Sequence, residues 1–181
     1  MKNRIRLFSL VTLFFLILLG LDRWMKLWTI DNLKGQPSYI LWKGDFQLTY
    51  AENVGAAFSL LENKQCFFVL ASAVISFFLI LSLIRVIRSS LFSWEKPVCR
   101  IYCFLAPMVL AGALGNMMDR LIYGYVIDTF DFVLIHYPIF NLADSYIVIA
   151  VIAFAVLVVF RKGYFEELEA LMARPKEPYD G

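Results

Sequence analysis

The sequence is poor in charged residues, in histidine and in cysteine. Of its 181 residues, 18% are charged and 61% are hydrophobic, with one histidine and three cysteines. Soluble domains carry about a quarter charged residues, so this composition excludes a water-soluble globule, a disordered chain and a disulfide scaffold. No Cys-x-x-Cys pair is present, and a zinc site would lack its usual ligands. We therefore expect neither a metal nor a cofactor.

An excess of either charge is also missing. The 17 Lys and Arg residues nearly balance the 15 Asp and Glu residues, which gives a net charge of +2 and indicates no nucleic-acid partner. Long uncharged runs are present instead, and a helix needs about 20 mainly apolar residues to cross a membrane. We expect one α-helical integral membrane domain, 1–181, with transmembrane helices over about 7–28, 65–86, 100–120 and 141–162.

The first and the fourth uncharged runs are too short to cross a bilayer unless they extend into charged flanks. The first then includes Asp22 and Lys26, and the fourth includes Asp144. Ionisable groups near the membrane boundary are costly, so they usually face a protein interior or a wet cavity. The shortness of the first and fourth apolar runs therefore points to a functional site at the charged residues that extend them.

Basic residues are unevenly divided between the two sides of the predicted membrane. Most lie in the N-terminus, in the 85–100 loop and in the C-terminal segment from Arg161 onward, so the positive-inside rule places both termini in the cytoplasm. The basic N-terminus and its apolar run also resemble a secretory signal peptide. No small-x-small cleavage site follows, and we interpret the run as an uncleaved first helix.

The outer segments and the tail have their own patterns. Residues 36–58 predict a small extracytoplasmic β-sheet of two short strands, joined around Lys43-Gly44-Asp45 and rich in β-branched and aromatic residues. In the cytosolic tail, 164–172 predicts an amphipathic helix and the remainder a disordered peptide.

Several polar groups lie where the membrane meets the outer compartment. They are Asp22, Lys26, Asn53, Asn116, Asp119, Arg120, Asp128 and Asp144. Most have a purely structural alternative. Asp22 and Lys26 could form an ion pair one helical turn apart, Asn53 could form a turn, and Asp119 with Arg120 could form an interfacial salt bridge. The small residues Gly112 and Gly115 could serve helix packing.

Asp128 and Asp144 have no adjacent basic residue, and two converging carboxylates can do chemistry. If both approach one water molecule, they share a proton, because ionising both is costly. The charged member then acts as general base and the neutral member as general acid. Two alternatives stay open on the residues alone: a small transporter or channel subunit that uses intramembrane acids, and a serine protease that uses Ser145, which has no lysine nearby in the sequence.

Four motifs, in order, resemble those of lipoprotein signal peptidase, the type II signal peptidase of bacteria. They are Asp22-Arg-Trp-Met-Lys26; Asn53-Val-Gly-Ala-Ala-Phe58; Gly112-Ala-Leu-Gly-Asn-Met-Met-Asp-Arg120 with Gly124-Tyr-Val-Ile-Asp128; and Phe140-Asn-Leu-Ala-Asp-Ser145. The resemblance implies an intramembrane aspartic endopeptidase that cleaves diacylglyceryl-modified prolipoproteins before the lipidated cysteine, near the outer face of the bacterial inner membrane.

The same resemblance implies roles for single residues. Asp128 and Asp144 would be the catalytic pair, and Asn116, Arg120 and Asn141 would line the site and hold the substrate backbone or the inhibitor globomycin. The partners implied are the lipidated precursor and membrane lipids, and we expect a monomer.

The remaining motif residues would support the site. Asp119 would orient its neighbours, Asp22, Lys26 and Asn53 would buttress the fold and the outer sheet, and Gly115 belongs to the same supporting set. Asp131 departs from the family pattern, which more often continues with apolar residues after the first aspartate, and we expect it on a loop surface.

Overall fold

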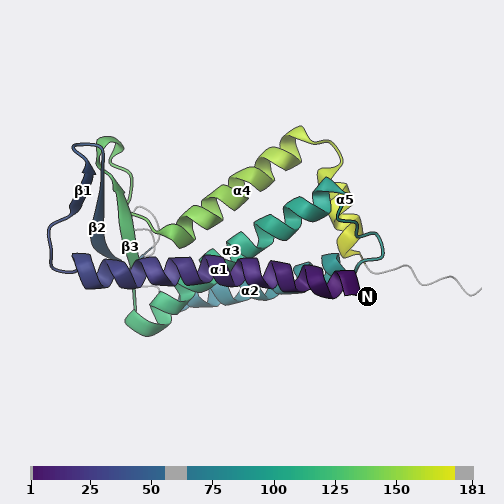
Figure 1. Cartoon of the computed structure of the whole chain (residues 1–181), viewed down its shortest axis with the longest axis horizontal. Coiled ribbons are helices and arrows are strands. Elements are labelled where there is room, and N and C mark those ends of the chain that lie inside the picture. The colour runs from purple at the N-terminus through teal and green to yellow at the C-terminus, as the bar shows by residue number, and fades with distance from the viewer. Residues whose placement is uncertain (1, 56–64, 174–181) are drawn as a thin grey trace, which may run out of the picture.

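The computed structural model describes residues 2–55 and 65–173 (Figure 1). The elements are α1 (Lys2–Leu33), β1 (Tyr39–Trp42), β2 (Phe46–Asn53), α2 (Gln65–Arg88), α3 (Pro97–Tyr123), β3 (Val126–Phe132), the 3₁₀ helix η2 (Val133–Ile135), α4 (Leu142–Phe160) and α5 (Tyr164–Met172). Within the described residues, α1 to α4 are long and apolar enough to cross a membrane. The expected fold class, four such helices with a small sheet, is confirmed.

Helix α3 is the central one. In its most apolar window 61% of the residues are buried, against 11% in α1 and in α2 and 17% in α4, and it packs against all three. Gly112 allows α4 to come close, because a Cβ there would meet Ile147 Cγ1 at 2.6 Å and also the carbonyl oxygen of Ala143. The other helices present most of their surface outward, as lipid-facing helices do.

Helix α1 is longer than the sequence indicated, since it continues past residue 28 to Leu33. It stays helical through Asp22 and Lys26 because both side chains are buried against other elements, at 1% exposure each, and have partners there. The charged flank is therefore part of the packed interior and does not end the helix.

The sheet has three antiparallel strands in the order β1-β2-β3. The two predicted strands are present as β1 and β2, but β3 was not predicted. A bulge lies on β2, where Leu48 pairs with Phe130 but Ala51 pairs with Asp128, and such bulges redirect the side chains that follow. Residues 56–58 of the predicted β element lie outside the described residues.

The sheet lies at one end of the helices, and α5 and the N-terminus lie at the other (Figure 1). Helix α5 occupies the predicted range 164–172 and buries Tyr164, Leu168 and Leu171 in a core with residues of α2 and α3. The part of the tail expected to be disordered, 174–181, lies outside the described residues.

Candidate active site

A tight turn between α3 and β3 places Asp128. Gly124 follows the last helical residue with φ of 81°, and its N–H donates to the carbonyl oxygen of Arg120 at 3.1 Å. This left-handed conformation is readily adopted only by glycine. The chain therefore reverses at once, and Asp128 on β3 lies near the end of α3 that carries Asn116, Asp119 and Arg120.

A second reversal brings Asp144 to the same place. Phe140 pairs with Phe130 of β3: its N–H donates to the Phe130 carbonyl at 3.1 Å, and its own carbonyl accepts from Phe130 N at 2.8 Å. Asn141 then lies beside Asp128 and caps α4, with its side chain accepting from Asp144 N and its N–H donating to the Asp144 carboxylate. This bridge and this helix cap together bring Asp128 and Asp144, sixteen positions apart in the sequence, to the same place.

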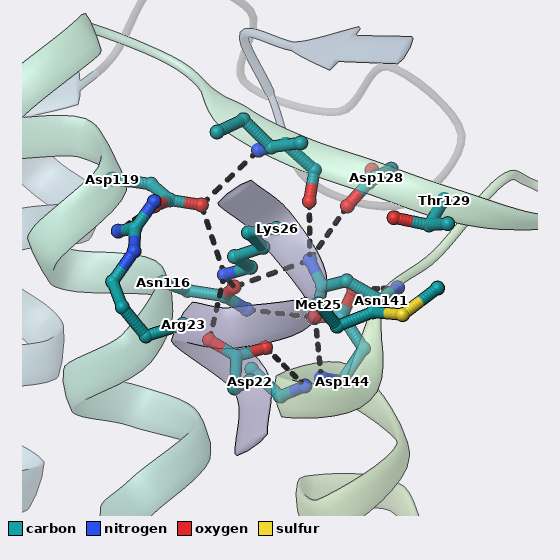
Figure 2. Close-up of polar contacts among 12 residues, drawn as sticks. Asp22, Arg23, Met25, Lys26, Asn116, Asp119, Asp128, Thr129, Asn141 and Asp144 are labelled. Carbon is teal, nitrogen blue, oxygen red and sulfur yellow. Dashed lines mark hydrogen bonds and ion pairs between the residues drawn. The ribbon is translucent and has the colours of Figure 1, made fainter. Parts of the chain in front are cut away.

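The two carboxylates share Asn141 and each has a further amide donor (Figure 2). Asn141 Nδ2 donates to Asp128 Oδ1 at 2.6 Å and Asn141 N donates to Asp144 Oδ2 at 3.2 Å. Asn53 Nδ2 donates to Asp128 Oδ2 at 2.9 Å, and Asn116 Nδ2 donates to Asp144 Oδ1 at 2.7 Å. Each aspartate is thus held through both of its oxygens.

Burial changes the acidity of Asp128, which is 1% exposed. Loss of solvation, together with the neighbouring negative charge of Asp144, raises the pKa of the Asp128 carboxyl to about 7, against the lowering effect of its amide donors. The raised pKa favours the protonated form of Asp128, and its titration is coupled to that of Asp144.

Lys26 lies behind the carboxylates and is fully satisfied. Its ammonium group contacts Asp119 Oδ2 at 2.9 Å, Asp22 Oδ2 at 3.1 Å and Asn116 Oδ1 at 2.9 Å, which accounts for all three of its N–H donors. Because Asn116 accepts from Lys26, its amide nitrogen is directed to Asp144. The expected ion pair between Asp22 and Lys26 is present, and it is one part of a larger buried cluster.

The two carboxylates paired with Lys26 also hold main-chain amides. Asp119 Oδ2 accepts from Ile127 N at 3.2 Å, and Asp22 Oδ1 accepts from Ala143 N at 3.0 Å. These amides belong to the residues immediately before Asp128 and before Asp144. The supporting ion cluster is therefore connected directly to the backbone of both candidate catalytic residues.

A cavity of about 300 Å³ opens beside Asp144 and is lined also by Asn53, Asn116 and Arg120 and by apolar residues of α4. Arg120 Nη2 donates to the Gly55 carbonyl at 3.1 Å, and the guanidinium lies 4.6 Å from the centre of the Phe68 ring. Within the described chain, the buried Arg120 Nε has no hydrogen-bond partner.

Comparison with known proteins fits this geometry. The family model described as signal peptidase (SPase) II matches residues 14–160. The chain belongs to the signal peptidase II family. A protein named lipoprotein signal peptidase in Caldanaerobacter subterraneus is 38% identical over 79% of this chain and 91% of its own length. One of the same name in Gloeothece citriformis is 39% identical over 83% and 88%.

A solved structure of a bacterial membrane enzyme gives the same result for the fold. It matches with a TM-score of 0.68 and 25% identity over 85% of this chain and 95% of its own. The resemblance inferred from the four motifs is confirmed, and membership in a signal peptidase family argues against the transporter alternative.

The close approach of Asp22 explains why position 115 of this signal peptidase II family member is a glycine. A Cβ at this position would lie 2.6 Å from Asp22 Oδ2 and 3.3 Å from Asp22 Cγ, so the absence of a side chain lets Asp22 reach Lys26. The expectation that Asp131 lies on a loop surface is wrong. This residue lies in β3, on the opposite face of the strand from Asp128, and accepts from Gln47 Nε2 at 2.7 Å.

Three further contacts of the site were not predicted. Thr29 and Thr129, both fully buried, share a hydrogen bond between their hydroxyls at 2.8 Å, and Arg23 Nη1 donates to Asp119 Oδ1 at 2.7 Å. The threonines are a hundred positions apart and carry no sequence signal of their contact. Ser145 donates to the Asn141 carbonyl at 3.0 Å. In the described residues, no group of three His, Cys, Asp or Glu is placed to hold a metal ion.

Proposed function

We propose that this member of the signal peptidase II family is an aspartic endopeptidase that removes the signal peptide from diacylglyceryl-modified prolipoproteins, cutting before the lipidated cysteine. Family membership supports the peptidase activity. The aspartic mechanism is supported by one observation: Asp128 and Asp144 both accept hydrogen bonds from Asn141, and amide groups donate to all four of their carboxylate oxygens.

The proposed chemistry uses a water molecule between the two carboxyl groups. The ionised aspartate takes a proton from this water, and the water oxygen attacks the scissile carbonyl carbon. At the same time the protonated aspartate donates its proton to the carbonyl oxygen. The tetrahedral intermediate then collapses, the C–N bond breaks, and the leaving nitrogen receives a proton from the pair. Asn116 and Arg120 line the cavity where the substrate backbone would lie.

The position of the cavity suits a substrate that stays in the bilayer. Each buried methylene of a lipid anchor contributes about 0.8 kcal/mol to membrane binding, so the precursor must reach the enzyme sideways. Ile147 and Val148 of α4 form part of the cavity wall, and α4 is one of the membrane-crossing helices. We propose the inner membrane of a bacterium as the location, with both termini in the cytoplasm and the site near the outer face. Globomycin-type inhibitors would compete for the same cavity, and we propose that the enzyme acts as a monomer.

The decisive experiment compares cleavage of a lipidated precursor by purified wild type and by Asp128→Asn and Asp144→Asn. Each variant should lose about a thousandfold or more in kcat, because acid–base catalysis of this kind contributes about 10² to 10⁴ per group. Asp131→Asn is the matched control, since it removes an acid of the same strand that faces away from the pair. Wild-type activity should be blocked by globomycin.

Two results would contradict the proposal. The first is a folded Asp128→Asn or Asp144→Asn enzyme that keeps most of its activity. The second is a rate that stays flat with pH, in an assay limited by chemistry, because one protonated and one ionised carboxyl should give a bell-shaped profile.

A further inference from the structure

A second hollow lies at the end of the molecule opposite the sheet, between the C-terminal end of α2 and the helix α5. Its volume is about 690 Å³. We call it the α2–α5 groove, and its lining includes Ile84, Arg85, Arg88, Leu91, Leu171 and Met172. Helix α5 forms a fixed wall because it buries Tyr164 and Leu168 in the core shared with α2 and α3.

The groove combines apolar walls with two guanidinium groups. Arg85 and Arg88 are three positions apart on α2, so they lie on the same face of the helix. Both are exposed, and the ion pairs formed within residues 2–55 and 65–173 involve other side chains. Two like charges at this spacing repel each other, so an anion bound between them would be favoured.

Neighbouring residues add to the positive charge. Arg4 places its guanidinium on the end of α2, donating to the carbonyls of Arg88 at 2.7 Å and of Ser89 at 3.0 Å. Arg161 lies in the adjoining hollow, where it pairs with Glu167 at 3.3 Å. Among the described residues, Glu167 of α5 pairs with Arg161, and neither Glu166 nor Glu169 lines the groove. The groove therefore keeps its basic character.

The position of the groove along α2 identifies its occupant. Arg85 and Arg88 end a helix whose preceding residues are almost all apolar, so they lie where α2 leaves the hydrocarbon layer, at the level of lipid phosphates. We propose that the α2–α5 groove binds an anionic phospholipid, with the phosphate on the two arginines and the first acyl methylenes on the apolar wall. This site is separate from the cavity beside Asp144 and does not depend on the proposed reaction.

Native mass spectrometry of the purified full chain tests this, with phosphatidylglycerol and phosphatidylcholine of identical acyl chains as probes. Wild type should bind phosphatidylglycerol preferentially. Arg85→Gln/Arg88→Gln should weaken that binding about thirtyfold, because each basic side chain near an anionic lipid contributes about a factor of five. The matched control is Arg100→Gln/Lys162→Gln, which removes two exposed cations that do not line the groove and should bind as wild type does.

A second variant tests the apolar part of the site without changing charge. Ala170 is exposed and lines the groove, so Ala170→Trp should fill it and also reduce phosphatidylglycerol binding while the protein stays folded. Equal losses in the groove variant and in its charge-matched control would overturn the proposal, as would unchanged binding in Ala170→Trp. Displacement of the lipid by excess soluble glycerol phosphate would also overturn it, since the groove would then be a site for a soluble phosphate.

Discussion

Replacement of Gly115 by alanine should destabilise the protein, although alanine is the better helix former. The new Cβ would lie 2.6 Å from Asp22 Oδ2, well inside contact distance, so Asp22 must move. Asp22 cannot move freely, because Oδ2 is paired with Lys26 at 3.1 Å and Oδ1 accepts from Ala143 N at 3.0 Å. The substitution therefore acts on the ion cluster and on the first turn of α4.

The size of the effect follows from two opposing contributions. Breaking a buried ion pair by displacing one partner costs about 3–5 kcal/mol, because a buried charge is left uncompensated. Exchange of glycine for alanine inside a helix returns about 1 kcal/mol. We expect Gly115→Ala to lower the free energy of unfolding by about 2–4 kcal/mol.

Gly20 offers a matched control in α1, since a Cβ there meets nothing within 4 Å. Gly20→Ala should be neutral or stabilising by up to about 1 kcal/mol. Thermal unfolding of both variants in one detergent measures the difference, and cleavage of a lipidated precursor should fall only in Gly115→Ala. If the two variants unfold at the same temperature, the close approach of Asp22 is not needed for stability and the reasoning fails.

Three further predictions concern the candidate site and its supporting ion cluster. The folded state binds the Asp128 proton more tightly than the unfolded chain does, so this carboxyl favours folding below about pH 4. The stabilisation, up to about 4 kcal/mol, is lost as the pH rises through about 7. Asp128→Asn should remove this part of the pH dependence of unfolding. Ser145→Ala should keep substantial peptidase activity, which would exclude a serine nucleophile, whereas complete loss in a folded variant would favour one. Lys26→Met should cost about 3–5 kcal/mol in chemical unfolding, and addition of Asp22→Asn should restore part of it, because one uncompensated carboxylate is then removed.

Most of the fold followed from the length and spacing of the apolar runs, because lipid imposes a minimum length on any helix that crosses it. The exceptions have local causes. The expected first helix, 7–28, already includes Asp22 and Lys26, but α1 continues to Leu33 because bilayer thickness sets only a minimum length for a helix and not its end. Strand β3 was missed because no β-hairpin turn precedes it: it follows directly from Gly124 at the end of α3 and pairs with β2, about 80 positions earlier.

The residues of the candidate site could be named from sequence motifs, but their connections could not. That Asn141 would contact both aspartates depends on the pairing of Phe140 with Phe130, which is a tertiary contact with no local pattern. Asn53 was expected only to support the sheet, yet it donates directly to Asp128. Its place on the same strand face as Asp128 depends on the β2 bulge, and the position of a bulge is not fixed by the alternation of residue types.

The ion cluster explains why a membrane enzyme would retain buried charges that are costly to desolvate. A buried ion pair seldom adds net stability compared with apolar residues of equal size. A contribution to stability therefore does not by itself explain why these buried charges are retained. Here one ammonium group joins Asp22 and Asp119, and these two carboxylates fix the amides of Ala143 and Ile127. Apolar side chains have no acceptor for those amides. The backbone before each candidate catalytic aspartate would then lose its anchor, and with it the geometry in which two carboxyl groups can share one proton.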